Sequence, residues 1–497
     1  MIFFTNHGII FLALFNNKQD GGISMFEDYI EKNILRQLFL CEQFYTKKEL
    51  DLALLSELLG VCKTTLLNDI NCLKKELATQ IVQAKRKKDS YSMYFVPSIP
   101  LFSLLQKLAV QSLFLKTCQL FLDGKTDYIQ LTEKEFISVS KAYCLRKQVL
   151  AFLRRCGIHI ENHQPVFTEL EHRLLQLTLS LRLGWQSNVP VPEAMLAYEH
   201  FLNAVLEKSH RIYDEENLEI LRLGFLISME RGKTAPIFFE PKFSNYLQER
   251  PVWQYIQDAW QATSLKNHLD ESELLFLGAI FNCCDYSFQS LASIEADFQH
   301  LHQAFIIENR DIQVLIERFE QHFQQAFLGN KPFERALIYL IRSAWDNYQL
   351  FLPGKLHVLS PCQKKLFEEL QHLISEWADA LPYDLAINPS LLRLFTIEFS
   401  GLLRLNRTQI HAYIVTDSDV KYLLYKDTLE AVTTCKIHIS PTIYNELSAE
   451  MQRSADRENK KILCEHALLT PDLSVSKNII PISIDTLETS IRQLIQA

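Results

Sequence analysis

The sequence predicts a mainly α-helical protein of several domains, with two helix-turn-helix units near its start and a small α/β domain at its end. Apolar residues recur at helical spacing over most of the 497 residues. Glycine and proline, which interrupt helices, number only 13 and 16. Strand-like runs alternate with helices only in about the last ninety residues. A chain of this length can build several separate cores.

The stretch from Leu52 to Leu77 has the pattern of a helix-turn-helix. A short apolar helix is followed by Gly60, and glycine tolerates the positive φ that a tight turn often requires. Val61 can fill the angle between the helices, and the second helix starts around Lys63–Thr64. Its apolar positions form one buried stripe, which consists of Leu66, Ile70, Leu73 and Leu77.

The opposite face of this second helix carries side chains suited to DNA. Thr, Asn and Lys hydrogen-bond base edges and phosphates when such a helix enters a major groove, and a leucine there can touch a thymine methyl group. We expect base contacts from Lys63, Thr64, Asn68 and Asn71, a methyl contact from Leu67, and phosphate contacts from Lys74 and Lys75.

A basic hairpin is expected directly after this helix. Two β-prone runs, 80–83 and 91–96, flank a cationic tip made of Lys85, Arg86, Lys87 and Lys88. A hairpin in this position is typical of the wing of a winged helix. We expect its charges to contact phosphates, which adds affinity without sequence information.

A second, weaker copy of the pattern follows. An apolar helix over Leu101–Leu122 leads to a short helix that Thr132 can cap, and Ser138–Ser140 form the turn. The next helix is expected to bury Tyr143, Leu145, Val149, Phe152 and Leu153, with Gly157–Ile160 as a following strand. Its cationic face consists of Lys141, Arg146, Lys147, Arg154 and Arg155. A simple helical linker is the alternative interpretation of this unit.

Amphipathic helices fill the middle of the chain, and the count and lengths suit two bundles of ordinary domain size. The predicted helices are Thr168–Leu183, Pro192–Glu207, Glu216–Glu230, Asp270–Tyr286, Ile312–Phe327, Pro332–Tyr348, Gln363–Ala378 and Pro389–Leu405. The tail then alternates strands and helices, which indicates a small parallel sheet. The tail segments are Ile410–Val415, Asp417–Glu430, Cys435–Ile439, Ile462–Leu469, Ile479–Ile484 and Thr486–Ile495.

The net charge of −8 is unevenly distributed. Residues 25–165 contain 20 Lys and Arg against 15 Asp and Glu, whereas the rest from residue 166 contains 30 against 43. A basic front and an acidic rear suit a DNA-binding head on a body that stays off the phosphates. Eleven cysteines without regular spacing indicate the reduced thiols of a cytoplasmic protein, and no apolar run is long enough to span a membrane.

Residues 1–24 have an apolar middle but neither a cationic start nor a small-residue cleavage site. We expect a non-native or disordered extension, with Met25 as the true start.

The layout resembles the Mga/AtxA family of global virulence regulators from Gram-positive bacteria. The resemblance rests on GVCKTTLLNDINCLKKEL at 60–77, on FISVSKAYCLRKQVLAFLRRCGI at 136–158, and on the order of the bundles and the tail. It implies two winged helices (25–99 and 100–166), two phosphotransferase-system regulation domains, or PRDs (167–290 and 291–406), and a tail similar to an enzyme IIB subunit (407–497). It also implies a transcription regulator, expected to be an activator, that self-associates as a homodimer or higher oligomer.

In such regulators the phosphocarrier HPr, charged by enzyme I, phosphorylates PRD histidines. The placement of His200, His268 and His322 makes them the candidate acceptors; the other histidines left open are His163, His172, His210, His300, His302, His357 and His372. An active IIB subunit needs a cysteine in the loop after its first strand. That loop reads Thr416–Asp419 here, without cysteine, so we expect the tail to serve assembly rather than phosphate transfer.

Other classes of function have weaker support. Cys156, His159 and His163 have a spacing that zinc could use, but a fourth ligand is absent nearby, so we expect neither a metal nor a cofactor. Glycine is scarce, and the chain has neither a phosphate-cradling loop nor a nucleophile elbow, so we expect no enzyme. Two rivals remain: a DNA-binding regulator whose body senses a peptide or small molecule, and a scaffold that keeps the helix-turn-helix shape without binding DNA.

Overall fold

The computed structural model describes residues 26–184, 192–342, 344, 359, 361–382, 385, 387–407, 410–432, 437–440, 442, 444–458, 460–469 and 478–487. The predicted extension 1–24, His357 and most of the predicted closing helix Thr486–Ile495 lie outside these residues. The described chain is mainly helical, as the sequence predicts, and it divides into two compact units, Met1–Ile397 and Glu398–Ala497. None of the described helices is long and apolar enough to cross a membrane.

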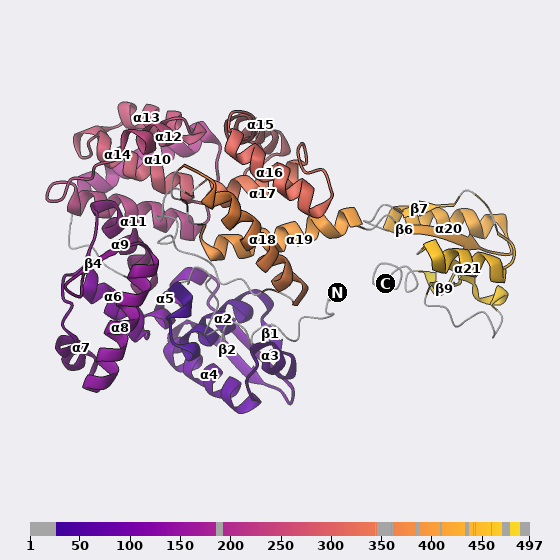
Figure 1. Cartoon of the computed structure of the whole chain (residues 1–497). Helices are drawn as coiled ribbons and strands as arrows, with labels where there is room; N and C mark the ends of the chain where they lie inside the picture. Colours follow the sequence, from indigo (N-terminus) through magenta and orange to yellow (C-terminus); the bar gives the residue numbers. More distant parts are fainter. Residues whose placement is uncertain are drawn as a thin grey trace. The chain divides into compact units, whose positions relative to one another are not determined.

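The first unit begins with three α-helices, two short 3-10 helices and a three-stranded antiparallel sheet (Figure 1). The strand order of this sheet is β1-β3-β2. These elements are η1 (Phe26–Asp28), α2 (Lys32–Lys47), β1 (Glu49–Asp51), α3 (Leu52–Leu59), α4 (Lys63–Glu76), η2 (Ala78–Gln80), β2 (Ile81–Arg86) and β3 (Ser90–Phe95). Their core has Phe44, Leu66, Ile70, Leu73 and Met93 at its centre, all fully buried.

A second group of helices ends in a short two-stranded hairpin. It contains α5 (Leu101–Ala109), α6 (Leu113–Leu122), α7 (Tyr128–Glu135), α8 (Val139–Arg155), β4 (His159–Glu161) and β5 (Gln164–Val166). The predicted single helix Leu101–Leu122 is therefore wrong. It is two helices, because Ser112 caps α6 and Glu31 accepts hydrogen bonds from Ser112 Oγ and from two backbone N–H groups of the first turn of α6.

Two further details of this group differ from the sequence-based prediction. Thr132 does not cap a helix: α7 starts four residues earlier, where Asp127 accepts a hydrogen bond from the backbone N–H of Ile129, and Thr132 lies in its interior. Tyr143 is not buried but 53% exposed, because it falls on the solvent side of α8 and contacts Tyr128 edge-to-face. The other predicted core positions of α8 are buried.

Helices account for the rest of the first unit. The first set contains α9 (Glu169–Leu183), α10 (Pro192–Ser209), α11 (Glu215–Arg231), α12 (Pro241–Gln248), α13 (Pro251–Ala262), η3 (Ser264–Asn267) and α14 (Glu271–Cys283). The second contains α15 (Leu291–His302), the π-helical turn η4 (Gln303–Ile307), α16 (Arg310–Phe323), α17 (Lys331–Ile341), α18 (Pro361–Asp379) and α19 (Pro389–Arg407), whose last residues belong to the second unit. All eight predicted helices correspond to observed ones; α12, α13 and α15 were not predicted.

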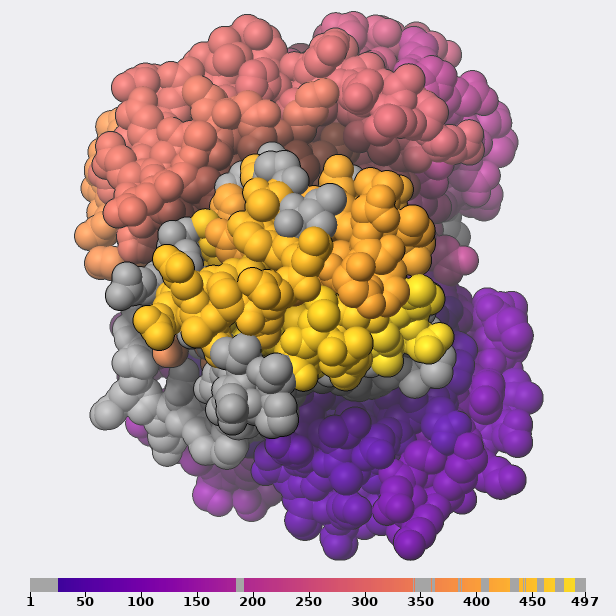
Figure 2. All heavy atoms as spheres, turned by 90° about the vertical axis from the view of Figure 1, so that its right-hand side faces the viewer, coloured from indigo at the N-terminus to yellow at the C-terminus, as the bar shows by residue number. Residues whose placement is uncertain are grey.

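The second unit is built on a four-stranded parallel sheet in the order β7-β6-β8-β9. Its elements are β6 (Ile410–Val415), α20 (Asp419–Val432), β7 (Ile437–Ile439), α21 (Ala449–Glu458), β8 (Lys461–Glu465), η6 (His466–Leu468) and β9 (Ile479–Ile482). Alternate residues of β6 enter two different cores, Ala412 and Ile414 on one face and Val415 on the other. Figure 2 shows these elements, coloured light orange to yellow, packed into one continuous body.

Candidate nucleic-acid interface

The turn between α3 and α4 is fixed by short-range contacts. Asp51 caps α3 by accepting hydrogen bonds from two backbone N–H groups of its first turn, at 2.7 and 2.9 Å. Gly60 ends α3 with a φ of 60°, a left-handed conformation that glycine adopts at little cost. The Ser56 hydroxyl then donates to the carbonyl of Val61, which closes the turn.

The two faces of α4 differ as the sequence predicts. The apolar stripe of Leu66, Ile70, Leu73 and Leu77 is fully buried. Lys63, Thr64, Asn68, Asn71 and Lys75 are exposed, whereas Lys74 and Leu67 are half-buried and Leu67 packs against the core. The face available to a groove is therefore polar, and the Leu67 methyl groups reach it only in part.

A buried ion pair under α4 was missed by the sequence analysis. Arg36 of α2 donates to Asp69 of α4 through Nε at 2.6 Å and Nη2 at 3.2 Å, and both side chains are nearly buried. Such a two-point contact restricts rotation of α4 about its own axis, so it determines which residues face outward. The sequence contained one indication of this ion pair: Asp69, directly before Ile70, is an acidic residue beside the apolar stripe of α4.

The predicted basic tip forms the end of the β2–β3 hairpin. Lys85 and Arg86 lie at the end of β2, opposite Ser92 and Tyr91 of β3, and residues 87–89 form the turn. All four basic side chains are exposed. The hairpin is joined to β1 through β3, whose backbone pairs with both neighbouring strands.

The charges of this tip are not equivalent. Lys87 donates to both carboxylate oxygens of Glu49 at 2.7 and 2.9 Å, and hydrogen bonds from Lys87 and Ser90 lower the pKa of Glu49. Lys63, at the start of α4, lies 3.8 Å from Asp89. Within the described residues Lys85, Arg86 and Lys88 make no ion pair. These three cations therefore have no anion of the described residues to displace before they can contact a phosphate.

The second helix pair has the same local construction. Phe136 ends α7 with a φ of 53°, and Ser138 caps α8 by accepting a hydrogen bond from the Lys141 backbone N–H at 3.3 Å. Lys141 and Lys147 are exposed. Arg146 instead donates to two backbone carbonyls, of Thr126 at 3.2 Å and of His163 at 3.3 Å. It connects α8 to the loops on either side, so less of its guanidinium is available to DNA.

The three candidate acceptor histidines lie in separate helical regions. His200 is exposed on α10, and His268 is half-buried in the segment before α14. His322 on α16 is exposed, with Nε2 3.6 Å from Glu369 and its ring against Phe323. His200 and His322 are thus exposed to a donor protein, as an acceptor requires, whereas His268 is exposed only in part.

The open alternatives include two histidines with structural roles. His172 is half-buried, and its Nε2 lies 3.2 Å from the carbonyl oxygen of Leu122. Burial, followed by the nearby Arg231 charge, lowers the pKa of His172. His302 Nδ1 lies 2.9 Å from the buried carboxylate of Glu334. Both rings already use one nitrogen inside the fold.

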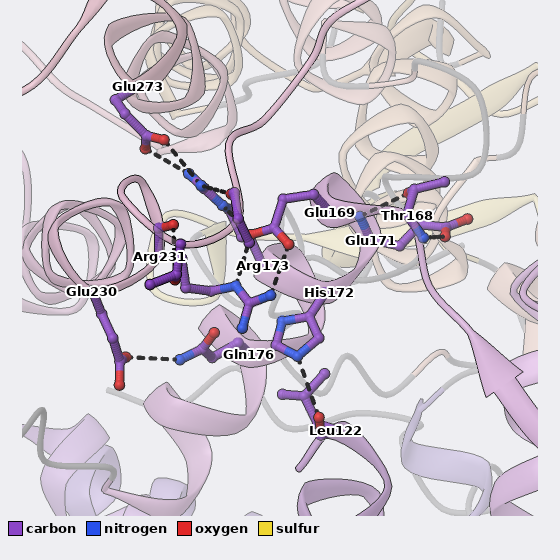
Figure 3. A network of polar contacts seen from close by, with 12 residues as sticks. Leu122, Thr168, Glu169, Glu171, His172, Arg173, Gln176, Glu230, Arg231 and Glu273 are labelled. Atoms are coloured by element: carbon purple, nitrogen blue, oxygen red, sulfur yellow. Dashed lines mark hydrogen bonds and ion pairs between the residues drawn. The ribbon is translucent and has the colours of Figure 1, made fainter. Parts of the chain in front are cut away.

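Next to His172 in the chain, Arg173 is part of a polar network that joins α9, α11 and α14 (Figure 3). Its centre is Arg173, which is fully buried and donates to both oxygens of Glu273 at 2.5 and 2.9 Å. Glu169 accepts from Arg173 and from Arg231, both at 2.7 Å. Burial alone would lower the pKa of the Arg173 guanidinium, but the hydrogen bonds and charges of Glu273 and Glu169 raise it, so Arg173 stays protonated.

The loop after β6 has the chemistry expected from its sequence. Lys421 pairs with Asp417 at 2.9 Å and with the buried Glu465 at 3.3 Å, and the Tyr425 hydroxyl donates to Glu465 at 2.6 Å. Two carboxylates at the carboxyl end of the central strands disfavour a phosphoryl group there. Cys464 lies in β8 and is buried, and burial raises the pKa of its thiol to about 11.

No metal-binding group of three or more His, Cys, Asp or Glu occurs among the described residues. Cys156 is buried and its pKa is raised to about 12 by burial, whereas His159 and His163 are exposed. No protein-family model matches the chain, and no curated protein matches it significantly. The resemblance to Mga/AtxA regulators therefore depends on the motifs and element order described above.

Proposed function

We propose that the protein is a cytoplasmic, DNA-binding transcription regulator that acts as an activator. The two helix-turn-helix units with their hairpins are then winged helices that bind double-stranded DNA. The observation that carries the proposal is the exposed Lys, Thr and Asn face of α4 beside three wing cations that make no ion pair with the described residues. A groove-reading face next to phosphate-neutralising charges is what such a protein needs.

Binding of the full-length chain to mixed-sequence duplex DNA tests this proposal. We expect an affinity that falls steeply with salt, because each phosphate contact releases counterions. The matched control is Lys208→Ala, which removes an exposed lysine of α10 far along the chain from both winged helices. Absence of binding at low salt would reject the regulator in favour of the scaffold.

The helical sets that follow are proposed to be PRDs, and the parallel-sheet unit a IIB-like assembly domain of a homodimer or higher oligomer. Accessible rings at His200, His268 and His322 support phosphorylation by HPr. Incubation with enzyme I, HPr and phosphoenolpyruvate should add acid-labile phosphate, and replacing the three histidines by alanine should abolish it. Labelling that survives the triple replacement would transfer the role to another histidine.

One observation favours the second candidate, a regulator whose helical body senses a small effector. A cavity opens beside His268, and its walls carry more cationic than anionic groups not already bonded within the fold. The two candidates differ in their need for the phosphotransferase proteins: only the first needs HPr and enzyme I.

A further inference from the structure

A cavity of about 270 Å³ lies at the end of α11, beside the η3 turn and the start of α14. Polar residues line it from two short segments of the chain, 228–233 and 266–268. They are Ser228, Lys233, Lys266, Asn267 and His268. The cavity is smaller than the usual range for drug-sized ligands, roughly 300–1,000 Å³, so its occupant is a small metabolite rather than a peptide or a dinucleotide.

Ser228 gives an independent indication of a ligand. Its side chain is 1% exposed, and its hydroxyl has no hydrogen-bond partner among the described residues. Leaving a buried hydroxyl without a partner costs about 1–3 kcal/mol, so folded proteins rarely keep one without a reason. A ligand oxygen in the cavity would satisfy it.

Gly232, directly after α11, lines the cavity. A Cβ there would lie 2.8 Å from the carbonyl oxygen of Ser228 and 2.9 Å from Glu273 Oε1, closer than real contacts allow. The first contact lies within the end of α11 itself, and the second is with the end of a flexible side chain. A larger residue would therefore strain the end of α11 and displace the Glu273 carboxylate.

The cations of the cavity outnumber its uncompensated carboxylates. Glu273 is paired with Arg173, whereas Asp270 accepts the Glu273 backbone N–H as the cap of α14 and keeps its charge. Lys233 is exposed, and Lys266 gives one of its three N–H donors to the carbonyl of Gln261. Two lysines, a histidine, an asparagine and a serine thus line a space in which Asp270 is the one carboxylate without a cationic partner among the described residues.

We propose that this cavity binds a small phosphate monoester, such as a sugar or polyol phosphate, without forming a covalent bond. A phosphate dianion matches two lysines in charge and offers three acceptor oxygens, which a carboxylate does not. The Asn267 amide and the Ser228 hydroxyl then serve the hydroxyl groups of the carbon chain. This inference goes beyond the proposed function, since it needs neither DNA nor the phosphotransferase proteins.

Calorimetric titration of the full-length protein with glucose 6-phosphate, glycerol 3-phosphate, inorganic phosphate and glucose tests the proposal. We expect the phosphate esters to bind and glucose not to bind. The double variant Lys233→Ala with Lys266→Ala should weaken binding about tenfold or more, since it removes two charge-assisted contacts. Lys208→Ala, on α10 and outside the cavity, is the control and should bind like the unaltered protein.

A second variant separates ligand binding from stability. Ser228→Ala removes a hydroxyl that has no partner, so the melting temperature without ligand should stay the same or rise, while phosphate esters bind more weakly. Mass spectrometry after the titration should find no phosphate on His268. Three results would overturn the proposal: no binding of any ester, binding that the two lysines do not affect, or a phosphoryl group transferred to His268.

Discussion

A defined part of the salt dependence of DNA binding should come from the three cations of the hairpin tip that make no ion pair with the described residues, Lys85, Arg86 and Lys88. Replacing Lys85, Arg86 and Lys88 by alanine leaves the hairpin backbone and its pairing with β3 intact. All three are exposed, so the change should not destabilise the fold. Lys87 is left in place, because Glu49 already holds it.

The magnitude follows from counterion release. Each phosphate contact contributes about 0.9 to the slope of log affinity against log salt, so three contacts contribute about 2.7. Over a fourfold change in salt this corresponds to a difference of about 40-fold in affinity. The triple variant should therefore have a slope shallower by about 2 to 3. Lys87→Ala should change the slope by less than one, since Glu49 competes with phosphate for the ammonium group.

Fluorescence anisotropy with labelled duplex DNA between about 50 and 200 mM salt measures these slopes. Glu49→Gln is the informative companion, because it releases Lys87 and should make binding tighter and more salt-dependent. If Lys87→Ala flattened the slope as much as the triple variant, the ion pair with Glu49 would be irrelevant to binding. An unchanged slope in the triple variant would mean that the wing does not contact DNA.

Three further predictions concern α4. Asp69→Ala leaves the nearly buried Arg36 without this carboxylate and should destabilise the fold around α4 by about 3–5 kcal/mol. Deuterium exchange of the α4 amides should become faster. The control Asp51→Ala, which removes the cap of α3, should cost only about 1 kcal/mol. Asn68→Ala should cost about 1–3 kcal/mol at one or two base pairs, while Lys75→Ala should weaken all sequences alike; equal weakening by both in a binding-site selection would disprove this division. Cys62 is the N-cap residue of α4, and a hydrogen bond with Thr65 lowers the pKa of its thiol. More thiolate is therefore present near neutral pH, and Cys62 should react with maleimide faster than the exposed Cys144. The pH profile of that reaction should move upward in Thr65→Val, and modified protein should lose DNA binding.

The two helices α3 and α4 and the turn between them could be predicted from the sequence because the information for them is local. The spacing of Leu66, Ile70, Leu73 and Leu77 determines the buried face of α4, and Gly60 marks the turn before it. The polar face follows from the same periodicity. The ion pair between Arg36 and Asp69 was missed because its partners are 33 residues apart and nothing local connects them.

The errors have the same origin. The segment 101–122 has an apolar helical pattern throughout, so it predicts one helix. The observed break at Ser112 is stabilised by Glu31, a residue 81 positions earlier whose carboxylate accepts hydrogen bonds from the start of α6. In the same way, both Asp127 and Thr132 are residue types that cap helices, and Asp127 is the one that caps α7. Periodicity alone does not decide between two nearby candidates.

The group α5–β5 and the first helical set do not form separate cores, and this bears on how the proposed regulation would work. One continuous cluster of buried side chains runs from Phe26 through α6 and α8 to Cys284 at the end of α14. Within it α9 contacts both sides: His172 lies against the carbonyl of Leu122 in α6, and Arg173 is held by Glu273 of α14. Close-packed interiors transmit small displacements rather than absorb them.

Glu273 also lines the cavity beside His268. A phosphoryl group in this cavity, attached to His268 or bound without a covalent bond, would therefore act on α14. Glu273 of α14 holds Arg173 of α9, and the preceding residue, His172, contacts α6. A fragment that ends at residue 165 would cut through this core and expose the faces of α5 and α6 that pack on α9. The proposed DNA binding and its proposed regulation should consequently be measured on the full-length chain, because the core of α6 and α8 is completed by side chains of the helices that follow.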